Sequence, residues 1–77
     1  MLAYLLVSPK EGFEQEVATI LMNNVQVEDV RFLKKNNNLI IEINADDEFE
    51  LQSFLLNQVL NIEGVQTASV LNDSEIN

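Results

Sequence analysis

Short apolar runs alternate with amphipathic stretches along this chain, and their order constrains the fold more than any other feature. Residues 2–7 read LAYLLV, which is typical of a strand buried on both faces. Apolar side chains then recur at helical spacing, at Phe13, Val17, Ile20 and Leu21. The same succession returns with the strand-like residues 39–43 and a second helical stripe, which consists of Leu51, Phe54, Leu55, Val59 and Ile62.

Local signals predict where the first helix begins and ends. Ser8 offers an N-cap hydroxyl, Pro9 suits the first helical position, and Glu11 completes a Ser-x-x-Glu capping box. A helix is therefore predicted to begin there, with Ser8 as a cap and not a nucleophile. Asn23 and Asn24 tolerate the left-handed conformation, and we expect the helix to end at them.

The segment between the helices has the pattern of a hairpin. Residues 25–34 alternate apolar and polar side chains, but the alternation slips by one residue at Glu28 and Asp29. This predicts an edge strand with a β-bulge at that point. Residues 34–38, which read KKNNN, predict the hairpin turn, because Asn is common at positive φ.

The second helix has a well-marked start. Asp46 and Asp47 precede it, and Asp47 and Glu50 have capping-box spacing. Gly64 is predicted to stop it in the left-handed conformation, before a last strand at residues 65–71. Residues 72–77 are expected to form a frayed tail.

The predicted order is strand, helix, strand, strand, helix, strand, which is the βαββαβ order of the ferredoxin-like fold. We therefore expect one α+β domain over residues 1–77, a two-layer sandwich with an antiparallel four-stranded sheet. A chain of 77 residues is near the lower limit for folding on one core. Both helices should cover one face of the sheet and leave the other face open.

Alternation along the strands predicts which residues lie on that open face. Ile40 and Glu42 should lie there, because an unpaired Glu is rarely buried. The same reasoning adds Tyr4 and Leu6 from the first strand, Arg31 and Leu33 from the second, and Thr67 and Ser69 from the last. This mixture of aliphatic and polar side chains predicts a peptide-binding surface.

Composition excludes several classes of function. A net charge of -9 opposes binding to nucleic acid or to an anionic membrane surface and favours a basic partner. Without His or Cys, the chain lacks common metal ligands, a thiol nucleophile and the usual proton-transfer group. We predict no enzymatic activity, no cofactor and no metal. The acidic cluster Asp46, Asp47, Glu48 and Glu50 does not match the spacing of a calcium loop, and the helix dipole accounts for it.

Targeting signals are sparse as well. The apolar runs are far shorter than the roughly 20 residues that a spanning helix requires. The N-terminus also lacks the charged region of a secretory signal peptide. A cytoplasmic protein without membrane insertion is therefore expected.

The second half of the chain carries a distinctive set of segments. Residues 39–47 read LIIEINADD and are followed by Leu51, by VLNIEGV at residues 59–65, and by Ala68 and Ser69. In these segments the chain resembles the NapD family of chaperones for periplasmic nitrate reductase. The first half agrees in pattern alone, through Leu5-Leu6-Val7 and the helix after it. One departure is that Asn72-Asp73 stand where the family has Tyr-His.

This resemblance implies a ferredoxin-like cytoplasmic protein that binds the twin-arginine signal peptide of the nitrate reductase catalytic subunit. Binding would delay export until the molybdenum cofactor is inserted. The departure at Asn72-Asp73 means that contacts made by Tyr-His cannot be carried over. An oligomer is compatible with the sequence.

Two other classes remain open. ACT or Lrp-type effector modules share the fold and bind small molecules, although their ligand loops usually carry glycines, and this chain has Ser8-Pro9 and Asn36-Asn37-Asn38 instead. A structural subunit of a larger complex would present a similar surface.

Overall fold

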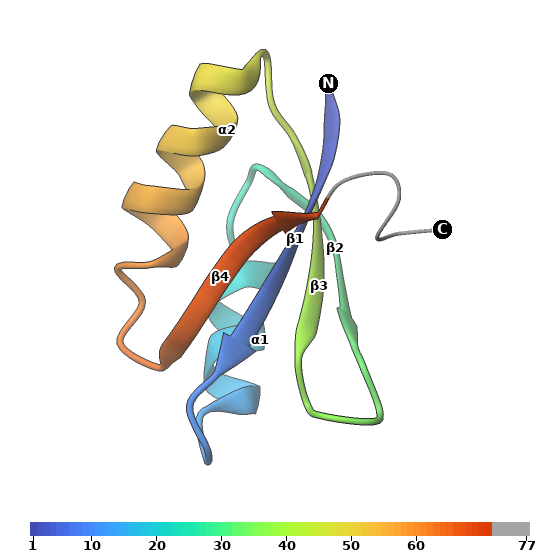
Figure 1. Cartoon of the computed structure of the whole chain (residues 1–77), viewed down its shortest axis with the longest axis vertical. Helices are drawn as coiled ribbons and strands as arrows, with labels where there is room; N and C mark the ends of the chain where they lie inside the picture. Colours follow the sequence, from blue (N-terminus) through green and yellow to red (C-terminus); the bar gives the residue numbers. More distant parts are fainter. Residues whose placement is uncertain (72–77) are drawn as a thin grey trace.

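The computed structural model describes residues 1–71, which form a four-stranded antiparallel sheet and two helical segments (Figure 1). The elements are β1 (Leu2–Pro9), α1 (Glu14–Met22), β2 (Val27–Phe32), β3 (Leu39–Asn44), α2 (Glu48–Phe54), the π-helical segment η1 (Leu55–Val59) and β4 (Val65–Leu71). The strand order is β2-β3-β1-β4, which confirms the predicted ferredoxin-like fold. The predicted tail, residues 72–77, lies outside the described residues.

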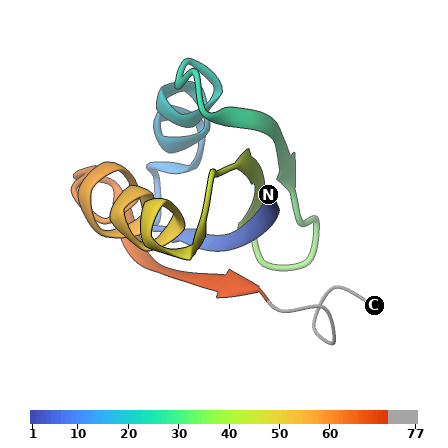
Figure 2. The same ribbon diagram turned by 90° about the horizontal axis from the view of Figure 1, so that it is seen from above.

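Both helices lie on the same side of the sheet, which Figure 2 shows from above. The two central strands, β1 and β3, bury every second side chain beneath the helices, namely Ala3, Leu5, Val7, Leu39, Ile41 and Ile43. The helical layer buries Val17, Ala18 and Leu21 from α1, and Leu51, Phe54, Leu55 and Val59 from α2 and η1. Alternation in β1 and β3 therefore predicted the core face correctly.

Three local predictions in the middle of the chain are confirmed. The register of β2 against β3 shifts between Val27 and Asp29, which is the expected bulge. Asn37 has a φ of 60° in the hairpin turn. Asp47 caps α2, because its carboxylate accepts a hydrogen bond of 2.8 Å from the Glu50 N–H.

The predicted start of the first helix is wrong. Strand β1 continues through Ser8 to Pro9, and Pro9 pairs with Val65 at a register shift. The Lys10 N–H then donates to the Gly64 carbonyl at 2.7 Å, so the chain stays bound to the start of β4. Helix α1 begins only at Glu14 and has no side-chain cap. Pairing with β4 therefore outweighs the local capping signal of Ser8 and Glu11.

Helix α1 ends at Met22 with Asn23 as its C-cap, where the sequence predicted its end, but other details differ from the expectation. Asn23 has a φ of -89°, in the right-handed and not the left-handed region, and its side-chain amide donates to the Thr19 carbonyl. Ile20 is 46% exposed and lies outside the core. Strand β2 is shorter than the predicted residues 25–34, and Val25 before it is 98% exposed. The turns at both ends of β2 account for the shorter strand.

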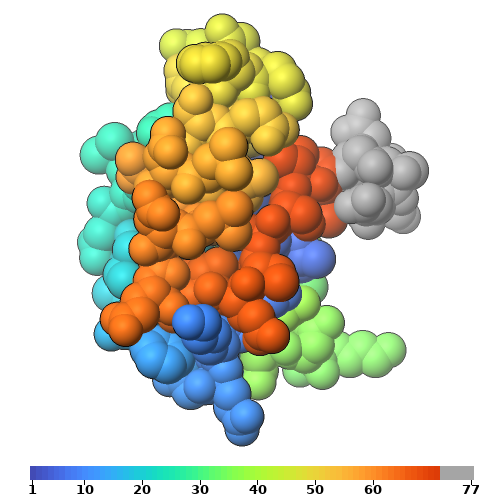
Figure 3. Space-filling view, turned by 60° about the vertical axis from the view of Figure 1, so that its left-hand side comes forward, coloured from blue at the N-terminus to red at the C-terminus, as the bar shows by residue number. Residues whose placement is uncertain are grey.

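The second helix changes its geometry near its end, which no sequence signal predicted. After Phe54 the backbone passes into η1, and the Leu60 N–H donates to the Leu55 carbonyl at 3.0 Å, five residues earlier. Figure 3 shows α2 and η1 covering one side of the molecule, with β4 beside them. No helix within residues 1–71 is both long and apolar enough to cross a membrane.

Gly64 has a different function from the one predicted. It does not adopt a positive φ; among residues 1–71, Gly12 is the glycine that does. Instead, a Cβ added to Gly64 would lie 2.8 Å from the Phe13 Cβ and Cδ1 atoms. Glycine at position 64 therefore permits the close contact between the start of β4 and the residue before α1.

Replacing Gly64 with Ala should destabilise the protein by about 1–3 kcal/mol, because the added methyl overlaps Phe13. Thermal unfolding should show the midpoint falling by about 4–8 °C for each kcal/mol lost. If the overlap is the cause, the same substitution made together with Phe13→Gly, which removes the Phe13 Cβ as well as the ring, should have a smaller effect. An undiminished effect in that background would contradict the contact as the reason for the glycine.

Candidate functional site

The uncovered face of the sheet is the candidate site, and its side chains form transverse rows. The register pairs Asp29 with Glu42, Glu42 with Tyr4, and Tyr4 with Leu71. Directly opposed residues in a sheet share a face, so these side chains lie in one row across all four strands. A second row consists of Arg31, Ile40, Leu6 and Ser69. Ser8 and Thr67 pair beside it.

The centre of this face is apolar. Tyr4, Leu6 and Ile40 are half-buried although no helix covers them. Leu2 has the same parity as Tyr4 in β1 and is 56% exposed. We call Leu2, Tyr4, Leu6 and Ile40 the apolar band. Three of its members, Leu2, Tyr4 and Leu6, follow one another along β1, and Ile40 lies beside Leu6 in β3.

Charged side chains border the band on the β2 side. Arg31 donates from Nε to the Asp29 carboxylate at 2.8 Å, and both side chains are largely exposed. The hydrogen bond that Arg31 donates to Asp29 and the charge of that carboxylate raise the pKa of Arg31, and Glu42 and Tyr4 contribute in the same direction. Such an exposed ion pair contributes little to stability. Asp29, Glu42 and Arg31 thus place two carboxylates and one guanidinium beside the apolar band.

The structure brings the predicted surface residues together with one exception. Tyr4, Leu6, Arg31, Ile40, Glu42, Thr67 and Ser69 lie in strands and on the open face by their register. Leu33 was predicted to lie in the second strand, but β2 ends at Phe32. The Leu33 N–H donates to the Asn38 carbonyl at 2.8 Å, so this residue closes the hairpin turn. Whether these side chains contact a peptide stays a prediction.

Sequence reasoning missed other residues of the same face. Leu2 and Leu71 share the parity of Tyr4 and Ser69, so the alternation could have found both. Asp29 shares the parity of Arg31 on the same side of the bulge, so the alternation could have found it as well. Asp29 and Leu71 extend the surface to both edge strands.

The described residues present no cluster of metal ligands and no unsatisfied buried polar side chain. No group of three or more Asp, Glu, His or Cys side chains within residues 1–71 could hold a metal ion. In the same part of the chain, every buried side-chain nitrogen or oxygen atom has a hydrogen-bond partner. The open face thus offers apolar contacts, hydroxyl groups and a few exposed charges.

No protein-family model matches the chain, and no curated protein matches it. Solved structures do share its fold. The crystal structure of FFRP-DM1 is 21% identical over 91% of this chain and 93% of its own, with a TM-score of 0.83. TTHA0845 from Thermus thermophilus is 23% identical over 91% and 88%, with a TM-score of 0.82.

A regulator has the same fold as part of a longer chain. The transcriptional regulator NMB0573 from Neisseria meningitidis, in complex with L-Met, is 21% identical to this chain. The similarity covers 94% of this chain and 50% of the regulator, with a TM-score of 0.79. At this level of identity, these likenesses establish the ferredoxin-like fold and nothing further.

Proposed function

We propose that this protein is a cytoplasmic export chaperone. It binds the twin-arginine signal peptide of a periplasmic nitrate reductase catalytic subunit and delays export until the cofactor is inserted. The observation that carries the proposal is the open face, where an apolar band without a covering layer is bordered by carboxylates. The resemblance of residues 39–65 to the NapD family supports the same assignment.

In this proposal, apolar contacts and electrostatic attraction contribute to different aspects of peptide binding. A twin-arginine signal peptide combines paired guanidinium groups with an apolar stretch, and the apolar band suits that stretch. The net charge of -9 attracts the basic part of the peptide from a distance. Apolar contacts with Tyr4, Leu6 and Ile40 therefore supply most of the affinity, and charge supplies the association rate.

Calorimetric titration with a synthetic twin-arginine signal peptide from a nitrate reductase tests this proposal. A peptide in which both arginines are replaced by lysine serves as the matched control, because it keeps the charge and loses the guanidinium geometry. We expect saturable binding of the first peptide and weaker binding of the second. Absence of binding to both would contradict the chaperone function.

Salt should act mainly on the association rate of this peptide. Raising ionic strength shortens the screening length from about 10 Å at 0.1 M to about 3 Å at 1 M, which removes long-range attraction. We expect the association rate to fall several-fold, with a smaller change in the dissociation rate. Stopped-flow fluorescence of a labelled peptide measures both rates. An association rate independent of salt would remove the electrostatic part of the proposal.

A second candidate function is a regulatory module that binds a small molecule, as ACT or Lrp-type domains do. The observation that favours it is the shared fold with a transcriptional regulator in complex with L-Met. Titration with a panel of free amino acids separates the two functions. A heat of binding measured with an amino acid, together with no heat of binding for the signal peptide, would favour the regulatory module.

A further inference from the structure

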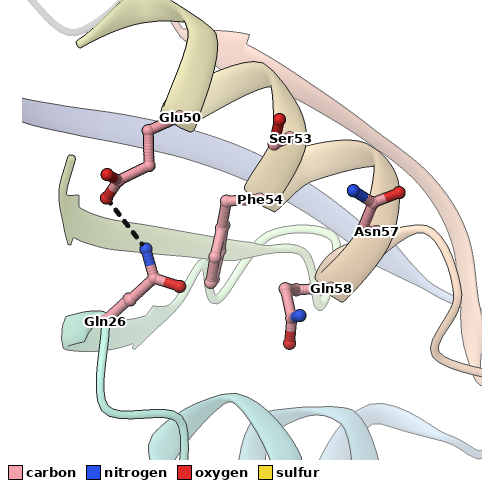
Figure 4. A pocket seen from close by; sticks show the side chains of 6 residues that line it. All are labelled: Gln26, Glu50, Ser53, Phe54, Asn57 and Gln58. Atoms are coloured by element: carbon pink, nitrogen blue, oxygen red, sulfur yellow. Dashed lines mark hydrogen bonds between the residues drawn. The ribbon is translucent and has the colours of Figure 1, made fainter. Parts of the chain in front are cut away.

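A separate hollow lies in the helical layer, on the other side of the sheet from the open face. It is bounded by α2, by η1 and by the segment that joins α1 to β2 (Figure 4). Its volume is about 130 Å³, and it is lined by Gln26, Glu50, Ser53, Phe54, Asn57 and Gln58. Phe54 is 2% exposed and lies at its apolar side, whereas the other lining side chains are polar.

Hydrogen bonds across the hollow hold its walls in place. The Gln26 side-chain amide donates to Oε1 of Glu50 at 3.2 Å, a bond that Figure 4 shows between the two walls. The Asn24 side-chain amide donates to Oε1 of Gln58 at 3.4 Å, which joins the α1–β2 segment to η1. Asn57 and Gln58 belong to the π-helical segment, a geometry that occurs frequently at functional sites.

The lining has the chemistry of a cation site. Glu50 is its one charged side chain, and its carboxylate is half-buried and oriented by Gln26. The amide oxygens of Gln26, Asn57 and Gln58 and the Ser53 hydroxyl supply further acceptors. The cationic side chains of the chain, Lys10, Arg31, Lys34 and Lys35, do not line the hollow.

Charge around the hollow favours the same kind of ligand. Asp46, Asp47 and Glu48 precede Glu50 at the start of α2. An anion in the hollow would be repelled by these carboxylates, whereas a cation would be attracted. A guanidinium group has five N–H donors in one plane and can contact several acceptors at once.

We propose that this hollow binds a guanidinium group, with Glu50 as the charged partner and the side-chain amide oxygen of Gln26, which lies beside Glu50 in Figure 4, as the nearest neutral acceptor. The methylene groups of the ligand would contact the ring of Phe54. The site is distinct from the open face, so it goes beyond the signal-peptide function proposed above. The guanidinium can come from an arginine of a partner or from a free guanidino compound.

NMR titration of the full chain with Nα-acetyl-L-arginine methylamide tests this proposal. The side-chain NH2 signals of Gln26, Asn57 and Gln58 report directly on the hollow. Nα-acetyl-L-citrulline methylamide is the matched neutral ligand, because it replaces the guanidinium by a urea of similar shape. We expect saturable shifts with the arginine compound and none of comparable size with the citrulline compound.

Variants identify the charged partner. Glu50→Gln should weaken binding of the arginine compound at least about tenfold, because a charge-assisted hydrogen bond is lost. Glu48→Gln removes the same charge from the same helical turn but not from the hollow, and should weaken binding less than about threefold. Equal binding of the citrulline compound, or wild-type affinity in Glu50→Gln, would overturn the proposal.

Competition then distinguishes the two sources of the guanidinium. Displacement of the arginine compound by the twin-arginine peptide would identify an arginine of the partner as the occupant. Simultaneous binding of both would exclude the arginines of this peptide as the source of the guanidinium. Failure of Nα-acetyl-L-arginine methylamide to bind would overturn the proposed site in the hollow. It would not affect the open face, because peptide binding there is tested by the separate calorimetric titration.

Discussion

Replacing Ile41 with Glu is expected to unfold the protein. Ile41 is fully buried in the central strand β3, beneath the helices. A carboxylate placed there loses its hydration, which costs several kcal/mol, and the apolar contacts of Ile41 are lost as well. A domain of 77 residues has a total stability of roughly 4–12 kcal/mol, so little or none would remain.

Far-UV circular dichroism and the dispersion of the NMR spectrum measure this outcome. Ile40→Glu is the matched control, since it introduces the same charge one residue earlier, on the open face. We expect Ile40→Glu to fold and Ile41→Glu not to fold. Equal stability of the two variants would contradict the assignment of the two faces of β3.

The second large effect concerns binding and not folding. Ile40 lies beside Leu6 in the apolar band, with Arg31 on its other side. A Glu at this position removes apolar contact area and places a hydrated charge where the apolar stretch of the signal peptide would lie. Central apolar contacts often dominate an interface, so we expect peptide affinity to fall at least about tenfold.

A second variant controls for the added negative charge. Leu56 is 56% exposed and belongs to η1, in the helical layer. Leu56→Glu changes the net charge equally and should leave peptide affinity within about twofold of the wild-type value, because the open face is intact. Calorimetric titration of both variants makes the comparison. Wild-type affinity in a folded Ile40→Glu protein would remove the open face from the proposed function.

The fold could be predicted from this sequence because the strongest signals are local and periodic. Alternation in β1 and β3 fixes which side chains are buried, and a slip by one residue would exchange the two faces. The bulge near Glu28, the turn at Asn37 and the cap at Asp47 each follow from residues within a few positions. These features agree with one another, which is what a sequence that specifies one fold requires.

The errors occur where distant segments override a local signal. Ser8, Pro9 and Glu11 satisfy a helix-start pattern, but pairing with β4 extends β1 to Pro9, and Lys10 then bonds to Gly64. Gly64 similarly matches a helix-stop pattern, whereas its actual role depends on Phe13, which lies far away in the sequence. No local pattern contains information on such contacts.

The two candidate sites also differ in how far they could be predicted from the sequence. Most of the open face follows from strand parity, and the exception is Leu33, which the turn removes from β2. The hollow of the helical layer could not be predicted, because Gln26 and Asn57 carry no motif and are brought together by tertiary packing.

The most direct test of the central claim is an NMR titration of the labelled protein with the twin-arginine signal peptide. The backbone amides of Tyr4, Leu6, Ile40 and Glu42 should shift most, followed by those of Thr67 and Ser69, because the peptide contacts the open face. Shifts confined to α1 and α2, or an unchanged spectrum at saturating peptide, would contradict the account.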